Sequence, residues 1–211
     1  SGSLIFWFNK FLEKVGHDKA QLVMHTDPFD PHGQNLQSII ENLGLVNGEV
    51  IFSREKLPAE GLASLYNFAD VTINVADAEG FGLGTLESLA CETPIIVTMT
   101  GGLQEQVTDG EQWFGVGLQP ASKAIIGSQE IPWIYEDRVN EGDVVDALEK
   151  LYNMSQEERG LIGKRGREHA LKNYGFDQYV SLWDQTLSEV HEKYGSWSTR
   201  QNYKTWELAE V

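Results

Sequence analysis

The stretch NVADAEGFGLGTLESLACETPIIV, residues 74–97, has the pattern of a strand, a turn, a helix and a second strand, in that order. Its apolar start completes a predicted strand over 70–76, and PIIVT predicts another over 94–98. Glycines at 80, 82 and 84 loosen the turn between them. Apolar residues at 86, 89 and 90 have helical spacing and predict a helix that starts near Leu83. Glu79 and Glu87 stand on either side of that start.

The same alternation continues on both sides of this stretch. Apolar spacing and glycine or proline breaks predict helices over 4–15, 35–43 and 59–68, strands over 20–25, 49–52 and 115–118, and a short helix after Gly101 and Gly102. Gly44 is placed to end the helix over 35–43 in left-handed geometry. Strands that alternate with helices through short connections predict an α/β fold, a parallel sheet with helices on both faces.

Beyond residue 108 the pattern changes. Residues 109–142 predict one strand, Gly115–Leu118, and otherwise a loop of unusual length, which is either functional or packed on something outside the chain. A helical extension follows: a helix over 143–153, a second to Tyr174 that Ser155 and Glu158 start as a capping box, and a third over about 177–194. We therefore predict one domain over 1–211, with C-terminal helices over about 143–195 and an aromatic tail over 196–211.

Composition excludes several functions. The chain has 16 Lys and Arg against 32 Asp and Glu, a net charge of −16, which argues against binding nucleic acid or anionic membranes. One cysteine, Cys91, rules out a disulfide framework and a cysteine metal cluster. No apolar run approaches the roughly 20 residues that span a bilayer, and we expect no secretory signal, because no basic segment precedes the first apolar stretch. We expect a cytoplasmic protein, or one attached to a membrane surface through another domain.

The turn at residues 79–84 is suited to an anion. The amides of Gly82, Leu83 and Gly84 lie at a helix N-terminus, where N–H groups lack partners and the helix dipole adds positive charge. A phosphate or diphosphate can bind there without a lysine. Glu79 and Glu87 are acceptors for vicinal sugar hydroxyls on either side of that diphosphate. Two glutamates at arbitrary spacing are more often a solvated loop residue and an ordinary first-turn helix acid. Together with the glycine turn and the helix start, however, the arrangement favours a nucleotide sugar.

The central stretch resembles the donor-binding signature of retaining family-4 glycosyltransferases with the GT-B fold. The resemblance rests on AEGFGLGTLESLACETPIIVTMTGGLQEQV, where E-G-F-G-L and a second glutamate complete an E-x7-E motif before a glycine pair. The order of the segments LVMHTD, EVIFSREKLPAEGLASLYNFADVTINVA and HALKNYGFDQYVSLWDQTLSEV agrees with it, so that roughly residues 4–190 are covered. It implies the C-terminal, Rossmann-like, donor-binding half of such an enzyme.

The resemblance also implies roles for individual residues. Glu79 would contact the hydroxyls of the transferred sugar as the catalytic-site glutamate, and Glu87 would accept hydrogen bonds from the ribose. The donor phosphates and sugar would be held by backbone amides, those of Gly80, Phe81, Gly82 and Leu83. Arg54 would lie beside the nucleobase, and Thr100 and Gly101 would line the same edge of the sheet.

Two departures from the family pattern bear on function. Glu92 stands where the family has glycine, at an expected cost of about 1 kcal/mol if the residue adopts left-handed geometry. The basic loop that contacts phosphate in the family, and its N-terminal acceptor domain, have no counterpart in these 211 residues. We therefore expect that the parent enzyme transfers a sugar, that this chain alone does not turn over, and that the N-terminal domain is its partner.

Other interpretations remain open at the level of sequence. A non-catalytic nucleotide-sugar-binding or regulatory module of the same fold is the main alternative, and a sugar-nucleotide epimerase is a weaker one. No cofactor and no metal are expected beyond a UDP- or GDP-sugar donor, because the five histidines lack metal-ligand spacing. The tail aromatics Trp197, Tyr203 and Trp206 predict packing groups or a surface for self-association.

Overall fold

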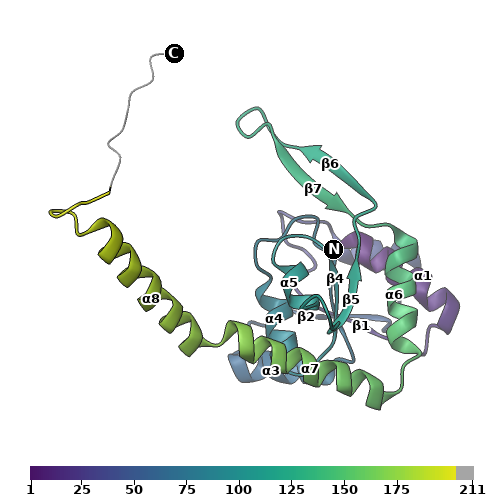
Figure 1. The fold of residues 1–211 in the computed structure, drawn as a ribbon. Coiled ribbons are helices and arrows are strands. Elements are labelled where there is room, and N and C mark those ends of the chain that lie inside the picture. The colour runs from purple at the N-terminus through teal and green to yellow at the C-terminus, as the bar shows by residue number, and fades with distance from the viewer. Residues whose placement is uncertain (203–211) are drawn as a thin grey trace. The chain divides into compact units, whose positions relative to one another are not determined.

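The structure is a computed structural model that describes residues 1–202. The chain divides into two compact units, Ser1–His169 and Ala170–Val211. The first contains all the strands of the described chain and the helices α1 to α6 (Figure 1). This division does not decide the prediction of a single domain over 1–211, which stays a prediction.

The parallel strands form two hydrogen-bonded ladders. β1 (Leu22–His25) pairs with β2 (Val50–Ser53), and β3 (Thr72–Asn74) pairs with β4 (Ile95–Thr98), which pairs in turn with β5 (Gly115–Leu118). Every pairing among these five strands is parallel, so the predicted α/β class is confirmed. No ladder bond joins β1 to β3, and each of these strands therefore has one edge without a partner strand in the described chain.

Helices cover the ladders and close the core. In Figure 1, α4 (Leu83–Ala90) and α5 (Leu103–Val107) lie on one side of β4 and β5, and α1 (Gly2–Val15) and α6 (Glu141–Tyr152) lie on the other. One buried apolar cluster joins both ladders, with Leu22 and Val50 from the first and Ile96 and Leu118 from the second. The two ladders thus share a single core despite the break between them.

Helix ends follow the signals in the sequence. In α2 (Leu36–Leu43), the side chain of Asn35 accepts from the amide of Ser38 at 3.0 Å, and Gly44 ends the helix with φ of 72°. In α7 (Gln156–Tyr174), the backbone N–H of Ser155 donates to Glu158 at 2.7 Å, while the Ser155 hydroxyl accepts from the Glu158 amide at 3.2 Å. Both predicted caps are confirmed, and α3 occupies the predicted Ala59–Phe68.

Helix α6 begins two residues earlier than predicted. The sequence suggested a start at Asp143, but the helix runs from Glu141, because the side chain of Asn140 accepts a hydrogen bond from the amide of Asp143 at 2.9 Å. Asn140 therefore acts as the N-cap. The correction places Glu141 and Asp143 in the first turn, where the helix dipole favours acidic side chains.

The long loop predicted after β5 is wrong in one part. β6 (Ser122–Ile126) and β7 (Ile134–Arg138) pair antiparallel as a hairpin that extends away from the parallel strands (Figure 1). A turn at its tip is closed by the amide of Ser128, which donates to the carbonyl of Ile131 at 2.9 Å. The signal was missed because the apolar residues of these strands face solvent rather than a core, so burial does not impose a clear alternation.

The second unit contains α8 (Phe176–Tyr194), which begins after Gly175 as predicted. Apolar side chains along it are exposed, among them Phe176, Leu182, Trp183 and Leu187. Trp197, in the predicted aromatic tail, is 86% exposed, and its ring lies under the guanidinium of Arg200. Tyr203 and Trp206 lie outside the described residues, so the prediction of self-association through the tail stays a prediction.

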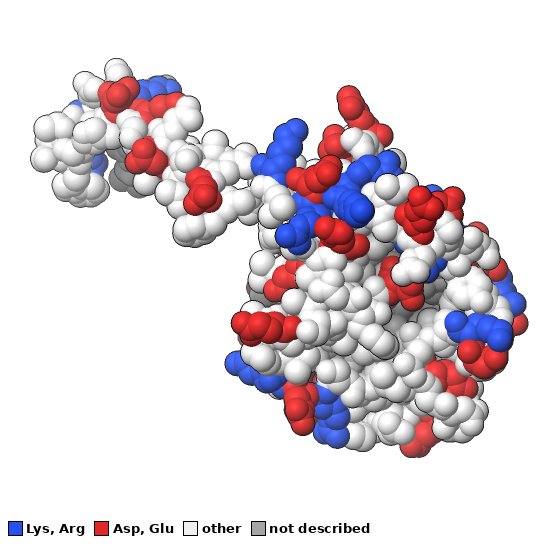
Figure 2. Space-filling view, turned by 90° about the horizontal axis from the view of Figure 1, so that it is seen from below, with Lys and Arg blue, Asp and Glu red and all other residues white. Residues whose placement is uncertain are grey.

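Charged side chains of both signs cover the face seen in Figure 2. Basic groups are densest in one cluster with acidic groups among them, and acidic groups and further basic groups are scattered over the rest of this face. The net charge of −16 is therefore not concentrated in a single acidic field on this side. Within residues 1–202, no helix is both long enough and apolar enough to cross a membrane.

Candidate donor-binding site

The centre of the candidate site is the turn between β3 and α4. Gly82 is the N-cap of α4 and has φ of 88°, a left-handed conformation that glycine adopts without strain. No side chain caps the helix, and Leu83 and Gly84 are exposed. The N-terminus of α4 therefore presents backbone N–H groups at the carboxyl edge of the ladder, as the sequence predicted.

The turn after β4 lies directly against this first turn. The amide of Gly102 donates to the carbonyl of Gly80 at 3.0 Å. At Gly101, where φ is 49°, a Cβ atom would lie 1.7 Å from the carbonyl oxygen of Glu79. Only glycine fits at this position, because the two backbones touch. The structure therefore brings the predicted residues Thr100 and Gly101 together with Glu79 and Gly80.

A buried polar network fixes the turn from below. Gln106, which is fully buried in α5, donates from its side-chain amide to the carbonyl of Phe81 at 2.7 Å. The hydroxyl of Thr85 lies 2.8 Å from the carbonyl of Gly82 and also bonds Gln106 Oε1. These contacts join α5, α4 and the turn through buried groups that water does not reach. They hold the backbone of residues 81–82 in one conformation.

The sequence predicted neither Thr85 nor Gln106 as a site residue. The available signal was their polarity: Thr85 lies in the first turn of a helix that packs on the sheet, and Gln106 stands beside Leu103 and Val107, which are also buried. A buried polar side chain in such a position usually bonds a nearby backbone group. Without the fold, however, nothing in the sequence named the carbonyl of Phe81 as that group.

The two glutamates differ in their surroundings. Glu79 is half-buried in the turn, and Glu87 is exposed one helical turn into α4. The hydroxyl of Tyr66, in α3, donates to Glu87 Oε2 at 2.9 Å. Burial, and then this bond to Glu87, raise the pKa of Tyr66, so the hydroxyl remains a proton donor. Tyr66 thus orients one oxygen of Glu87 and leaves the other for a further partner.

A second buried hydroxyl lies at this edge of the ladder. Thr98 ends β4, two residues before Thr100, and its side chain is fully buried. Its hydroxyl has no hydrogen-bond partner among the described residues. Such a group costs about 1–3 kcal/mol when unpaired, and because Thr98 has no exposed surface, a ligand bound at the edge would not reach it.

Arg54 lies at the end of the other ladder, after β2. Its guanidinium is 3.5 Å from Asp27 Oδ1 and 5.6 Å from the ring centre of Phe29, both in the loop that follows β1. Among the described residues, Arg54 makes no hydrogen bond or ion pair with residues 79–87, and its role beside a nucleobase stays a prediction. The α2 side of that loop borders a separate groove.

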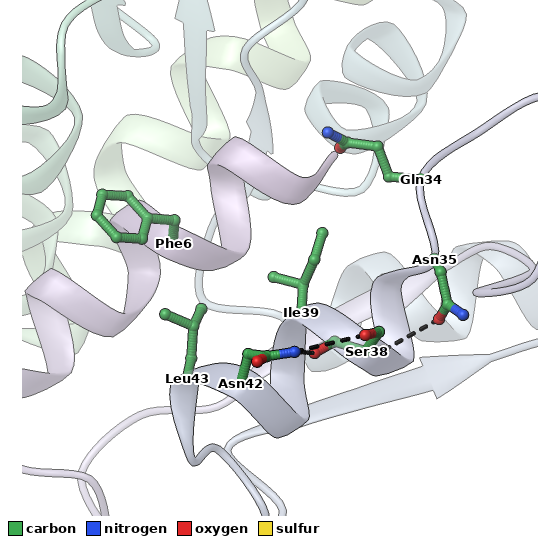
Figure 3. A pocket seen from close by; sticks show the side chains of 7 residues that line it. All are labelled: Phe6, Gln34, Asn35, Ser38, Ile39, Asn42 and Leu43. Atoms are coloured by element: carbon green, nitrogen blue, oxygen red, sulfur yellow. Dashed lines mark hydrogen bonds between the residues drawn. The ribbon is translucent and has the colours of Figure 1, made fainter.

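This groove lies between α1 and α2 and has a volume of about 500 Å³. Phe6 from α1 and Ile39 and Leu43 from α2 provide its apolar lining, with Asn35, Ser38 and Asn42 along the α2 side (Figure 3). It contains none of the predicted donor-binding residues. Over residues 1–202, no group of three or more His, Cys, Asp or Glu side chains is arranged to hold a metal ion.

The hairpin is attached to the same turn. The amide of Asp137 donates to the carbonyl of Asp77 at 2.7 Å, and Arg138 Nη1 donates to Asp77 Oδ2 at 2.6 Å. Arg138 also bonds Glu136. Asp77 is two residues before Glu79, so the base of the hairpin and the candidate site share one segment of backbone.

Helix α4 ends at the predicted departure from the family pattern. Glu92 has φ of 62°, a conformation in which glycine is less strained. Cys91, beside it, is half-buried, and burial raises the pKa of its thiol above the ordinary value. The strained residue Glu92 lies nine positions after Leu83, the first residue of this short helix.

Comparison with known proteins places this geometry in a family. The sequence profile described as Glycosyl transferases group 1 matches residues 17–169. The D-inositol 3-phosphate glycosyltransferase of Paenarthrobacter aurescens (strain TC1) is 32% identical over 158 residues, which are 75% of this chain and 32% of that protein. The chain therefore spans about a third of the length of this curated relative.

Solved structures share the fold at lower identity. The C-terminal domain of a group 1 glycosyl transferase (LpcC) from Francisella tularensis superposes with a TM-score of 0.59 at 20% identity, covering 83% of this chain and 80% of that one. Anabaena Alr3699/HepE, solved in complex with UDP and glucose, superposes with a TM-score of 0.58 at 15% identity, covering 87% and 52%. The fold is that of the C-terminal domain of GT-B glycosyltransferases. Since the profile spans more than half of the chain, the protein belongs to the group 1 glycosyltransferase family.

Proposed function

We propose that this chain is the donor-binding part of an enzyme that transfers a sugar from a nucleoside-diphosphate sugar to an acceptor. The observation that carries the proposal is the contact between the two glycine turns, where the amide of Gly102 bonds Gly80 and the backbone of Gly101 touches Glu79. This contact leaves the uncapped N-terminus of α4 accessible between Glu79 and Glu87. The family membership supports the choice of ligand.

Each part of the proposed donor has a counterpart in the site. The amides of Gly80, Phe81, Gly82 and Leu83 bind the diphosphate and sugar. Glu79 accepts hydrogen bonds from the transferred sugar, and Glu87 accepts from the ribose through the oxygen that Tyr66 does not use. Arg54 lies toward the base, and Thr100 and Gly101 line the edge.

The proposed reaction breaks the bond between the sugar's anomeric carbon and the diphosphate. Negative charge then increases on the leaving diphosphate oxygen. Backbone N–H groups that already point at this position stabilise the charge without reorganising, which lowers the barrier. Glu79 and Glu87 hold the donor in place during that step. Retention of configuration at the anomeric carbon is part of the proposal on the strength of the family resemblance.

The proposal assigns further phosphate contacts, and the contacts that hold the reacting end of the acceptor, to parts of the enzyme outside this chain. On that view the 211 residues bind donor weakly and do not turn it over. A nucleotide-sugar-binding module without catalysis remains the alternative function, and it shares the donor site. Donor hydrolysis or sugar transfer by the isolated chain would contradict the proposed division of labour.

Calorimetry with a matched pair of nucleotides tests the ribose assignment. UDP should bind more tightly than 2′-deoxy-UDP to the wild-type chain, and Glu87→Ala should weaken UDP about tenfold or more, since a hydrogen bond to a charged group contributes ~1.5–3 kcal/mol. In this variant the preference for UDP over 2′-deoxy-UDP should disappear. A GDP pair run in parallel identifies the base.

The control variant is Glu105→Ala, which removes an exposed glutamate of α5 and changes the net charge equally. It should bind UDP as the wild type does. If Glu87→Ala retains both its affinity and its preference for the ribose hydroxyl, Glu87 does not bind ribose and the proposed donor pose is wrong.

A further inference from the structure

One face of the β6–β7 hairpin carries aromatic rings and hydrogen-bonding groups together. Ile125 is paired across the strands with Tyr135, and Lys123 with Asp137, so these four side chains project from the same face. Trp133 precedes Tyr135 by two residues, so its side chain lies on the same face as these four. We call this set, Lys123, Ile125, Trp133, Tyr135 and Asp137, the aromatic face.

The two aromatic rings of this face are exposed to solvent and contact each other. Trp133 and Tyr135 are 65% and 51% exposed, and their ring centres lie 5.9 Å apart in an edge-on arrangement. The ammonium of Lys123 lies 5.6 Å from the centre of the Tyr135 ring and 3.6 Å from Asp137 Oδ1. The hairpin thus provides two ring surfaces beside a donor and an acceptor of hydrogen bonds.

The aromatic face is tied to the proposed donor site through the hairpin base. Asp137 and Arg138 bond Asp77, two residues before Glu79. Trp133 is four residues from Asp137, or about 13 Å along a strand that rises ~3.4 Å per residue. A ligand on the rings therefore lies beyond the reach of a single sugar placed at the donor turn.

The chemistry of the face selects its occupant. A pyranose ring has one face of C–H bonds, which carry slight positive charge, and a rim of hydroxyls. The negative face of an indole or phenol ring attracts such C–H groups, while Lys123 and Asp137 suit the hydroxyls. A protein partner would favour a broader apolar surface, and the net charge of −16 disfavours an anionic lipid or nucleic acid.

From these contacts we propose that the aromatic face binds a carbohydrate, the extended part of an oligosaccharide acceptor. The inference rests on the proposed function in one respect, that the chain belongs to a sugar-transferring enzyme. It goes further by naming the acceptor class: a chain of several sugar units, with its reacting end at the donor turn and a later unit stacked on Trp133 and Tyr135.

The test uses the ¹⁵N-labelled 211-residue chain without any nucleotide. Glucose, mannose, cellohexaose, maltohexaose and a mannohexaose are titrated while the indole N–H signal of Trp133, identified by its loss in Trp133→Phe, is followed by NMR. At least one hexasaccharide should shift this signal saturably, and its monosaccharide should bind at least about tenfold more weakly, a difference of ~1.4 kcal/mol. Trp133→Ala lacks this indole signal, so its binding is followed by the backbone amide of Ile125, also in the wild type; it should bind the hexasaccharide more weakly by about the same factor.

Two further variants control for misfolding and for non-specific binding to exposed apolar side chains. Tyr135→Phe keeps a ring and should retain most of the affinity. Ile131→Ala removes an equally exposed apolar side chain from the hairpin tip, outside the aromatic face, and should bind as the wild type does. The inference is overturned if no hexasaccharide shifts Trp133, if Trp133→Ala binds unchanged, or if Ile131→Ala loses as much as Trp133→Ala.

The outcome of the hexasaccharide titration is independent of the outcome of the UDP measurement. If hexasaccharides bind at Trp133 but Glu87→Ala leaves UDP affinity unchanged, the acceptor surface stands and the donor pose fails. If Glu87→Ala loses UDP and no hexasaccharide binds, the donor pose stands and the acceptor surface fails. A shift of Trp133 that follows protein concentration without sugar points to a second copy as the occupant and also overturns the inference.

Discussion

The turn before α4 and the β6–β7 hairpin both follow strands of the same ladder, yet they are held in opposite ways. The turn is fixed by backbone contacts at Gly101 and by the buried side chain of Gln106. The hairpin is joined to the body at Asp77 and has exposed apolar side chains at its far end. In the turn, position is determined by packing within the chain. In the hairpin, the side chains that distinguish it contact little of the chain, which is the pattern expected of a recognition surface.

The sharpest test of this contrast is Gly101→Ala. The new Cβ would collide with the Glu79 carbonyl at 1.7 Å, and φ of 49° adds strain. We expect a loss of about 3 kcal/mol or more in the free energy of unfolding, from overpacking and left-handed strain together. Urea unfolding followed by circular dichroism measures it.

Gly110→Ala is the matched control for that variant. Gly110 also has positive φ, 93°, but a Cβ there would meet nothing within 4 Å. The free energy of unfolding of this variant should fall by only about 1 kcal/mol, the cost of positive φ for alanine. If both variants lose the same amount, the backbone contact between the two glycine turns does not constrain the site.

Gln106→Leu should have the next largest effect. It keeps most of the side-chain volume but removes the amide that donates to the Phe81 carbonyl, while the Thr85 hydroxyl keeps its bond to the Gly82 carbonyl. An unpaired buried polar group costs about 1–3 kcal/mol, and we expect a loss of about 2 kcal/mol in unfolding free energy. Gln104→Leu, in the same helix but exposed, should change it by less than about 0.5 kcal/mol. Equal losses would mean that the buried network adds nothing.

The contrast also explains what the sequence could reveal. Ser155 with Glu158, and Gly44, act through bonds to near neighbours in the chain, so the caps of α7 and α2 were predictable. Glu79 and Glu87 were predictable on either side of a helix start because they, too, lie close together in the sequence. The Tyr66 bond to Glu87 joins residues 21 apart, and the Gln106 bond to Phe81 joins residues 25 apart. Such pairs depend on how the elements pack, which local pattern does not encode.

The hairpin was unpredictable for a different reason. Strand predictions depend on alternation between a buried and a solvated face, and Ile125, Ile126, Ile134 and Tyr135 are all exposed to a similar degree. The sequence SKAII therefore lacks the signal that made PIIVT clear, since β4 is buried along its whole length. The break between β1 and β3 was likewise invisible, because each strand has a normal pattern by itself.

A smaller change should stabilise the end of α4. Glu92→Gly relieves the left-handed strain at φ of 62°, and we expect a gain of about 1 kcal/mol in unfolding free energy. Glu92→Ala keeps the strain and removes the same charge, so it should show no such gain. A gain in both variants would assign the effect to the removal of the Glu92 carboxylate, which lies 3.9 Å from Arg167 Nε.

The smallest effect is expected where the two regions meet. Asp77→Asn removes the carboxylate that pairs with Arg138, but the side chains are 45% and 42% exposed, and pairs of this kind contribute about 0–1 kcal/mol. Arg138 keeps Glu136, and the amide of Asp137 keeps the Asp77 carbonyl. Amide exchange over residues 122–138 should therefore accelerate only about threefold, within that range, and the difference should shrink in 1 M salt.

Lys123→Gln distinguishes the attachment of the hairpin to Asp77 from the stability of the hairpin itself. It breaks the ion pair with Asp137 inside the hairpin and leaves the bonds to Asp77 intact. Its effect on exchange should be confined to residues 122–138, whereas Asp77→Asn should also affect the amides around Glu79. If Asp77→Asn instead costs as much unfolding free energy as Gln106→Leu, the hairpin is packed as firmly as the turn. The aromatic face would then be part of the fold rather than a surface held out for a ligand.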